Sequence, residues 1–220
     1  VCTASESLSI KLDKLVQEYV DVNEFSGTVL VAKDGKTVFE KGYGFANVEW
    51  QIPNAVDTKF RIASTTKPFT AMLVLQLVDE GKLKLSNTVS DILPNYRKDT
   101  GSKVTIHQLL NHTSGIPDIF RQPDYKKIKT NNTYSVDEYI TQLCSGDLAF
   151  EPGTKFRYSN AGYVILGKIV EHLTNKTFEQ VLSERILKPL NMTDTGFDSP
   201  KKIILKRATG YEKTLDGLVG

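Results

Sequence analysis

The spacing of hydrophobic residues predicts one amphipathic helix and then a strand pair at the start of the chain. Over about residues 6–22, apolar side chains recur every three or four positions, the period of a helix that buries one face. Residues 27–33 and 36–42 are instead β-branched runs, separated by Asp34-Gly35, a typical hairpin turn because Gly accepts positive φ. We therefore expect an antiparallel sheet to begin here.

The middle of the chain is expected to be mostly helical. Residues 64–80 are apolar on nearly all faces, which predicts a buried central helix, and Gly81 is expected to cap its C-terminus in a left-handed conformation. Further helical patterns, joined by loops rich in Asn, Pro, Gly and Ser, cover residues 104–111, 136–144, 161–173 and 178–187.

Strand patterns return only weakly near the end, in residues 201–205 and 208–211. A two-stranded hairpin is marginally stable alone, so we expect further strands from polypeptide outside this chain. The fold class predicted is α+β, an antiparallel sheet flanked by helices plus a mostly helical subdomain. The expected parts are residues 1–62, with the opening helix and first strands, residues 63–196, mostly helical, and residues 197–220, which start the return to the sheet.

Composition and charge exclude several classes of protein. Hydrophobic residues make up 40% of the 220 residues and charged residues 25%, as in ordinary globular proteins. The 28 Lys and Arg are interleaved with 26 Asp and Glu, so we expect neither nucleic acid nor an anionic membrane surface as a partner. The longest near-continuous apolar run, residues 69–78, is broken by Thr70 and Gln76 and is too short to span a bilayer, which predicts no transmembrane segment.

Cysteine and histidine offer no metal site or disulfide framework. Cys2 and Cys144 are the only cysteines, and Cys144 lies in a helical pattern, so we interpret it as a small core residue. The three histidines have no metal-ligand spacing and no evident Ser-His-Asp arrangement. The chain begins at Val1, which leads us to expect that a segment was removed upstream.

Ser64 and Lys67 form a candidate nucleophile and proton acceptor. Positions i and i+3 share one helix face, and Pro68, which lacks an N–H, places both residues at the start of the helix. There the helix dipole favours negative charge, and the Ser64 N–H is free for an oxyanion hole. The alternative is a capping serine beside a surface lysine. A second match, Ser199-Pro-Lys-Lys202, has no helix behind it, and we interpret it as a solvated turn.

Tyr158-Ser159-Asn160 precedes a second apolar helix and carries the other candidate site residues. A phenolate is a competent base where a cation such as Lys67 lowers its pKa, and an Asn side chain both donates to and accepts from an amide. The alternative is a capping Asn160 beside a packed Tyr158. Because the histidines are not placed for catalysis, a serine nucleophile here needs another base, and Lys67 with Tyr158 fits that need.

Three segments together resemble one enzyme superfamily, the serine β-lactamases and penicillin-binding peptidases. The similarity runs from about residue 27 to residue 196 and is nearest to the branch of class C β-lactamases, D-alanyl-D-alanine carboxypeptidases and family VIII esterases. The matching segments are Phe60-Arg-Ile-Ala-Ser-Thr-Thr-Lys67, Leu109-Leu-Asn-His-Thr-Ser-Gly-Ile-Pro-Asp118 and Pro152-Gly-Thr-Lys-Phe-Arg-Tyr-Ser-Asn160. The resemblance favours the catalytic interpretation of both motifs and leaves Ser199 as a turn.

The resemblance implies a β-lactamase/transpeptidase-like fold and acyl transfer, with no cofactor. Ser64 would attack a carbonyl, Lys67 and Tyr158 would move its proton, and Asn160 would bind the substrate amide. The third motif of the family, Lys-Thr-Gly or His-x-Gly, is not found, because Lys213-Thr-Leu215 has Leu in place of Gly. We therefore expect low activity from this chain alone. Two explanations stay open: a C-terminal fragment of the same precursor remains associated as a second chain, which we favour, or this chain is only a fragment of the protein.

The leading functional hypothesis is a serine hydrolase of D-amino-acid peptides or related amides and esters, similar to D-alanyl-D-alanine carboxypeptidases. Two alternatives stay open. One is a β-lactamase or esterase of the same family, and the other is a non-hydrolytic penicillin-binding or scaffold protein. The resemblance also implies a location outside the cytoplasm, periplasmic or secreted.

Overall fold

The computed structural model describes residues 4–122, 125, 134–199, 201–214 and 217–219. The chain divides into two compact units. Unit 1 comprises residues 1–62 and 197–220, and unit 2 comprises residues 63–196. Helices occur together with two-stranded antiparallel sheets, which agrees with the predicted α+β class.

Unit 1 begins with a helix and a hairpin, as the sequence predicts. Helix α1 (Ala4–Asp21) is followed by the antiparallel strands β1 (Gly27–Lys33) and β2 (Lys36–Tyr43). Their turn has Asp34 at φ 51° and Gly35 at φ 72°, so both central residues have the positive φ that suits the twist of a tight hairpin.

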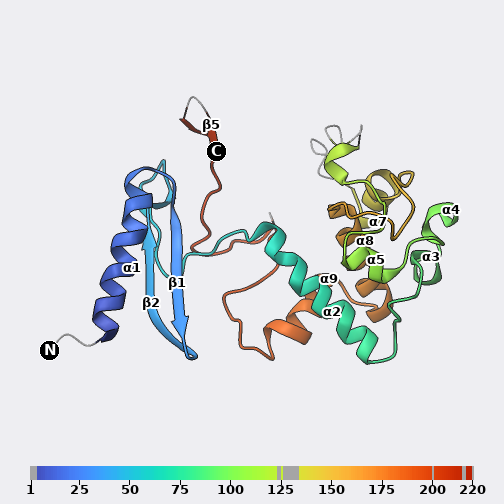
Figure 1. Ribbon diagram of the computed structural model, residues 1–220, viewed down its shortest axis with the longest axis horizontal. Helices are drawn as coiled ribbons and strands as arrows, with labels where there is room; N and C mark the ends of the chain where they lie inside the picture. Colours follow the sequence, from blue (N-terminus) through green and yellow to red (C-terminus); the bar gives the residue numbers. More distant parts are fainter. Residues whose placement is uncertain (1–3, 123–124, 126–133, 200, 215–216, 220) are drawn as a thin grey trace. The chain divides into compact units, whose positions relative to one another are not determined.

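Helix α1 lies along the hairpin on the side of β2 (Figure 1). The Asp13 carboxylate accepts hydrogen bonds from Lys41 Nζ at 2.7 Å and from the Tyr43 hydroxyl at 2.6 Å. The Lys41 ammonium is the main reason that the pKa of Asp13 falls below its ordinary value, with Tyr43 adding to the effect. A polar cluster therefore joins the helix to the strand.

The predicted strands at residues 201–205 and 208–211 are wrong. Residues 201–205 form turns and irregular chain, and the returning segment makes a single parallel bridge between Lys59 and Arg207. Lys206 has a positive φ of 60°, which interrupts an extended run. The other short strands of unit 1 are β3 (Phe45–Asn47) with β4 (Ile52–Pro53), and β5 (Glu212–Thr214) with β6 (Gly217–Val219).

Unit 2 is built from helices. In chain order they are the 3₁₀ turn η1 (Ala63–Thr66), α2 (Lys67–Asp79), α3 (Val89–Ile92), α4 (Lys98–Gly101), α5 (Ile106–Leu110), the 3₁₀ turn η2 (Ile119–Arg121), α7 (Val136–Tyr139) continued by the π-turn η3 (Ile140–Cys144), α8 (Asn160–Thr174), and α9 (Phe178–Leu182) continued by the π-turn η4 (Ser183–Leu187). Each helix predicted here is present; residues 136–144 and 178–187 have the predicted ends, and the ends of the others are shifted. For example, α5 begins after Thr105 because that residue forms a capping box with Gln108.

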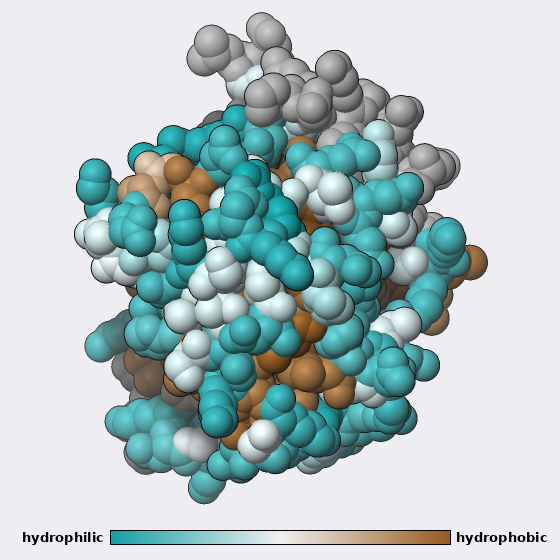
Figure 2. Space-filling view, turned by 90° about the vertical axis from the view of Figure 1, so that its right-hand side faces the viewer, coloured by the Kyte–Doolittle hydropathy of each residue, from teal (hydrophilic) through white to brown (hydrophobic). Residues whose placement is uncertain are grey.

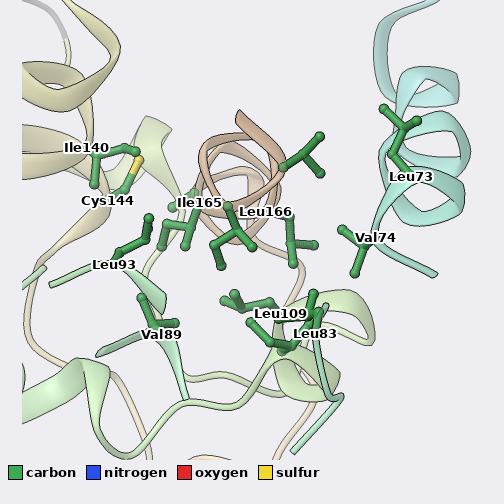
Figure 3. Close-up of a cluster of buried hydrophobic side chains, with 14 of the residues drawn as sticks. Leu73, Val74, Leu83, Val89, Leu93, Leu109, Ile140, Cys144, Ile165 and Leu166 are labelled. Atoms are coloured by element: carbon green, nitrogen blue, oxygen red, sulfur yellow. The ribbon is translucent and has the colours of Figure 1, made fainter. Parts of the chain in front are cut away.

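The core of unit 2 surrounds α8. Ile165 and Leu166 of this helix are fully buried in one cluster with Val74 of α2 and Leu109 of α5 (Figure 3). Cys144 is buried at the edge of the same cluster, as predicted for a core residue, and burial raises the pKa of its thiol to about 12.

The face carrying α3 and α4 is mostly hydrophilic, with apolar residues between the polar ones (Figure 2). Packing of α2 and α5 against α8 fixes the helix starts that carry the candidate site.

Candidate active site

Ser64 lies in η1, one turn before α2 begins. Pro68 occupies the first turn of α2, where its missing N–H costs no hydrogen bond, and Gly81 ends the helix with φ 69°, as predicted. Ala63, just before the serine, has the left-handed φ of 44°. That conformation is uncommon for a residue with a side chain, so the nucleophile segment enters the helix through a strained residue.

The Ser64 hydroxyl is contacted by two titratable side chains. Lys67 Nζ donates a hydrogen bond to Ser64 Oγ at 3.0 Å, across one helical turn. The Tyr158 hydroxyl, 94 positions along the chain, donates to the same oxygen at 2.7 Å. Lys67 Nζ also lies 4.7 Å from the centre of the Tyr158 ring. The structure thus brings the three predicted catalytic residues together around one oxygen atom.

Asn160 is the first residue of α8 and contacts Lys67. Its Oδ1 accepts a hydrogen bond from Lys67 Nζ at 2.8 Å. The cap of α8 is Ser159, whose Oγ accepts from the Gly162 N–H at 3.4 Å. Tyr158 is 42% exposed. Asn160 is therefore not the cap of α8, since the adjacent serine is, and both flanking side chains face the lysine–serine pair.

The segment that follows α5 joins this site through the main chain. The backbone N–H groups of Ala149, Gly153 and Arg157 donate to the carbonyls of Gly115, Thr113 and His112, at 2.8, 2.8 and 2.9 Å respectively. Gly115 has φ 76°, and a Cβ there would lie 2.4 Å from the Phe150 carbonyl oxygen. This close approach needs glycine, and it explains how residues 109–118 and 152–160 come side by side.

Asp118 is a site residue that sequence reasoning missed. It is only 7% exposed, and its Oδ2 accepts hydrogen bonds from both the N–H and the Nδ2 of Asn160, at 2.8 and 2.9 Å. Its Oδ1 accepts from the Phe120 N–H at 2.9 Å. Asp118 is the last residue of the second segment that carries the family resemblance. Its contact with Asn160 could not be predicted, because the two residues are 42 positions apart in the sequence.

His112 is the second residue missed. Its ring centre lies 4.5 Å from that of Tyr158 and 5.2 Å from that of Tyr163, so the imidazole packs between two tyrosines. The Ser159 N–H donates to His112 Nδ1 at 3.3 Å. Burial lowers the pKa of His112, the nearby Lys67 charge lowers it further, and Asp118 opposes the shift. Burial and the Lys67 charge both favour the neutral imidazole, the form that can accept a hydrogen bond at Nδ1.

The electrostatics of the cluster favour ionisation of one phenol and disfavour that of its neighbour. The pKa of Tyr158 is lowered, first by its interaction with Lys67 and then by the hydrogen bond to Ser64. Burial instead raises the pKa of Tyr163, whose hydroxyl donates to the Leu110 carbonyl at 3.0 Å. Tyr158 can therefore lose its proton more readily than an ordinary tyrosine, and it does so beside a hydroxyl that needs an acceptor.

Other candidate positions lie outside this cluster. Ser199 sits in a turn, where its Oγ accepts from the Lys201 N–H at 3.2 Å, as expected for a non-catalytic match. Lys213 lies in β5, while Leu215 and Cys2 fall outside the described residues. Within the described ranges, no group of three or more His, Cys, Asp or Glu is placed to hold a metal ion, and no helix is long and apolar enough to cross a membrane.

Comparison with known proteins identifies relatives over nearly the whole chain. Protein flp of Staphylococcus aureus (strain N315) is 32% identical over 206 residues, which cover 92% of this chain and 41% of that protein. A penicillin-binding protein homologue from Pyrococcus abyssi, described as octameric, has a TM-score of 0.79 and 32% identity, covering 95% of this chain and 49% of that one. The D-amino acid amidase of Ochrobactrum anthropi SV3 has a TM-score of 0.78 and 28% identity, covering 95% and 61%.

The chain spans less than half the length of flp. Its sequence also matches the Beta-lactamase family over residues 12–219, a range that includes all three segments on which the resemblance rests. The superfamily and the fold predicted from those segments are thereby confirmed, and the chain belongs to the Beta-lactamase family.

Proposed function

We propose that this protein is a serine hydrolase that forms an acyl-enzyme at Ser64 and acts on D-amino-acid peptides or related amides and esters, as a D-alanyl-D-alanine carboxypeptidase does. The observation that carries the proposal is the double contact at Ser64 Oγ, 3.0 Å from Lys67 Nζ and 2.7 Å from the Tyr158 hydroxyl oxygen. A serine hydroxyl needs a proton acceptor to become a nucleophile, and both neighbours are titratable.

The proposed reaction begins when Ser64 Oγ attacks the substrate carbonyl carbon. The serine proton passes to ionised Tyr158 or to neutral Lys67 along the existing contacts, since a phenolate or an amine accepts where the protonated group had donated. The Ser64 N–H, at the start of the helix, stabilises the oxyanion. The tetrahedral intermediate then collapses, the C–N or C–O bond breaks, and the leaving group takes up the proton. Water releases the acyl group by the same steps in reverse order.

The proposed substrate class is supported by family membership and by similarity to known enzymes, and not by a contact in the site. Membership of the Beta-lactamase family and similarity to a D-amino acid amidase both favour a hydrolase of amide-type substrates. The same family membership supports the second candidate, a β-lactamase or esterase. A scaffold that only binds penicillin has less support, because it needs neither a lowered pKa at Tyr158 nor the Lys67 contact to Ser64. A location outside the cytoplasm is part of the proposal.

We further propose that full activity requires polypeptide outside residues 1–220. The Lys-Thr-Gly or His-x-Gly motif of the family is not found in this sequence, and the chain covers 41% of flp. A fragment of the same precursor is the partner we propose for this role. Loss of one oxyanion-hole donor costs roughly 10²- to 10³-fold in rate, so residues 1–220 alone should react slowly.

The first experiment is a denaturing intact-mass spectrum of the native preparation, taken before and after exposure to a penicillin. It weighs every polypeptide present and detects acylation at the same time. A penicillin adduct on this chain supports the acyl-enzyme, and a second co-purifying polypeptide of the same precursor supports the proposed partner. No adduct from a penicillin or from an activated ester, on the whole protein, contradicts the hydrolase proposal. Steady-state rates with a penicillin, a D-alanyl-D-alanine peptide and a simple ester then separate the three substrate classes.

A further inference from the structure

The carboxylate of Asp118 is unusual because it is buried beside the candidate active site and held by N–H groups. Its three contacts come from the Phe120 N–H at 2.9 Å and from the N–H and Nδ2 of Asn160 at 2.8 and 2.9 Å. A buried charge is costly unless hydrogen bonds replace its water, and these three donors do so. Two of the three come from one residue, which is itself in contact with Lys67.

These contacts fix which way the Asn160 side-chain amide points. A carboxylate only accepts hydrogen bonds, so the atom of Asn160 that faces Asp118 must be the donor Nδ2. A lysine ammonium only donates, so the atom that faces Lys67 must be the acceptor Oδ1. The oxygen and nitrogen of an amide are hard to tell apart by shape, but here the chemistry of both neighbours allows one orientation. One Nδ2 proton of Asn160 then stays available.

We propose that Asp118 is a positioning residue that locks the amide of Asn160. In this state Oδ1 holds Lys67 beside Ser64, and the second Nδ2–H is presented to a substrate that carries an amide carbonyl next to the reacting one. If the amide turned over, its NH₂ group would face the Lys67 ammonium and its oxygen would face the Asp118 carboxylate, so both contacts would become repulsive. The proposal rests on the proposed function, because it gives Asn160 a substrate contact.

The test is a double-mutant cycle with Asp118→Asn and Asn160→Ala in the whole protein, assayed with an amide-bearing substrate such as a penicillin. An asparagine at position 118 has one acceptor, so it cannot receive both the Phe120 N–H and the two Asn160 donors. We expect each single variant to lower kcat/KM by roughly 10- to 100-fold, as expected for a displaced catalytic group. In the Asn160→Ala background, Asp118→Asn should cost less than about threefold, because the two residues act as one unit. Multiplying effects would overturn the proposal.

Asp91→Asn is the matched control. Asp118 caps η2 by accepting the Phe120 N–H, and Asp91 is an exposed carboxylate that accepts the Thr88 N–H in the capping box of α3. Asp91→Asn therefore also weakens a cap, but outside the candidate site. Its kcat/KM should equal that of the unsubstituted protein. A loss as large as that of Asp118→Asn would mean that weakened caps, and not the Asn160 amide, explain the effect.

A second measurement does not depend on activity or on the folding of a variant. With ¹⁵N-labelled asparagine, the two Nδ2 protons of Asn160 should exchange with solvent at different rates, because one is bonded to a buried carboxylate and the other is not. Equal, fast exchange contradicts the lock even if the enzyme is active. If the whole protein is never acylated but the two protons differ, the proposed function fails while the role of Asp118 in holding the amide stands.

Discussion

Ser64 and Ser199 are each followed by a lysine three positions later, yet their surroundings have little in common. Ser64 precedes the thirteen-residue helix α2, one face of which, with Leu73, Val74 and Leu77, is buried. The Ser64 hydroxyl contacts Lys67 and Tyr158. Ser199 lies in an irregular segment, and its hydroxyl accepts a hydrogen bond from the Lys201 N–H, a turn contact. The spacing is the same, but Ser64 has a base, a second titratable partner and a helix start, whereas the Ser199 hydroxyl is held in a turn.

The difference shows that chemistry at this spacing depends on a second segment of chain. Lys67 would sit near Ser64 in any helix, but Tyr158 and Asn160 reach the pair because α8 packs in the core between α2 and α5. At Ser199 the neighbouring apolar side chains are exposed, with Ile203 at 94%. The buried packing of α2, α5 and α8, which brings two helix starts together, thus distinguishes the candidate nucleophile Ser64 from the turn serine Ser199. Each variant below tests one part of this contrast.

The largest effect is expected from Ser64→Ala. Without the hydroxyl no acyl-enzyme can form, so the penicillin adduct should disappear, and turnover should fall by at least about 10⁴-fold, as for other serine hydrolases. Intact-mass spectrometry of the variant after exposure to a penicillin measures this directly. An adduct of unchanged yield on Ser64→Ala protein would show that another residue is the nucleophile.

Lys67→Ala should come next, with acylation slowed by about 10³-fold or more. The variant removes a proton acceptor, which is worth roughly 10²- to 10⁴-fold, and also the contact that holds Asn160 Oδ1 at 2.8 Å. Lys168→Ala is the control, because Lys168 is a lysine of the same unit that pairs with Asp137. Rates of adduct formation should be compared for both. Similar rates for the two variants would rule out a specific role for Lys67.

Tyr158→Phe should slow acylation by about 10²-fold and change its pH dependence. Because the pKa of Tyr158 is lowered from its ordinary value of 10.0, chiefly by Lys67, the phenolate forms at a lower pH than usual. If that phenolate is the base, kcat/KM rises with pH through the lowered pKa, and the variant lacks this rise. Tyr163→Phe keeps its ring near Lys67 and should retain the rising limb. A rise that persists in Tyr158→Phe would assign it to another group.

Patterns along the chain predicted the helices of unit 2 and the first hairpin, because those elements depend on local periodicity and turn residues. They failed for residues 201–205 and 208–211, where β-branched content indicated strands. There, the described residues form one parallel bridge, Lys59 with Arg207, and no named strand, and Lys206 with positive φ interrupts the extended run. Strand formation depends on partners distant in sequence, which a single segment does not specify.

The site shows the same division. Ser64, Lys67, Tyr158 and Asn160 could be named because each lies in a short motif at a helix start. Asp118 and His112 were not assigned roles, since their importance comes from contacts made after folding. Asp118 pairs with a residue 42 positions away, and His112 packs between two tyrosine rings. The sequence indicated a role for this region only through the resemblance of residues 109–118, which include both side chains, to the enzyme superfamily.

Ser159→Ala should have a moderate effect on stability rather than on chemistry. Ser159 is 1% exposed, and its Oγ accepts the Gly162 N–H at 3.4 Å, so the variant removes the cap of α8. Loss of such a cap costs about 1 kcal/mol in the free energy of unfolding. Denaturant unfolding of the whole protein measures this cost, and the acylation rate should fall less than about tenfold. No loss of stability would show that α8 is held by packing alone.

The smallest effect is expected from Ser199→Ala. This serine is half-buried and its hydroxyl makes a turn contact with Lys201, so its loss should change the free energy of unfolding by less than about 0.5 kcal/mol. The rate and yield of the penicillin adduct should match those of the unsubstituted protein in parallel mass spectra. A slower rate with unchanged stability would mean that Ser199 takes part in the reaction. The turn around Ser199 would then not exclude this serine from the chemistry, and the contrast with Ser64 would fail.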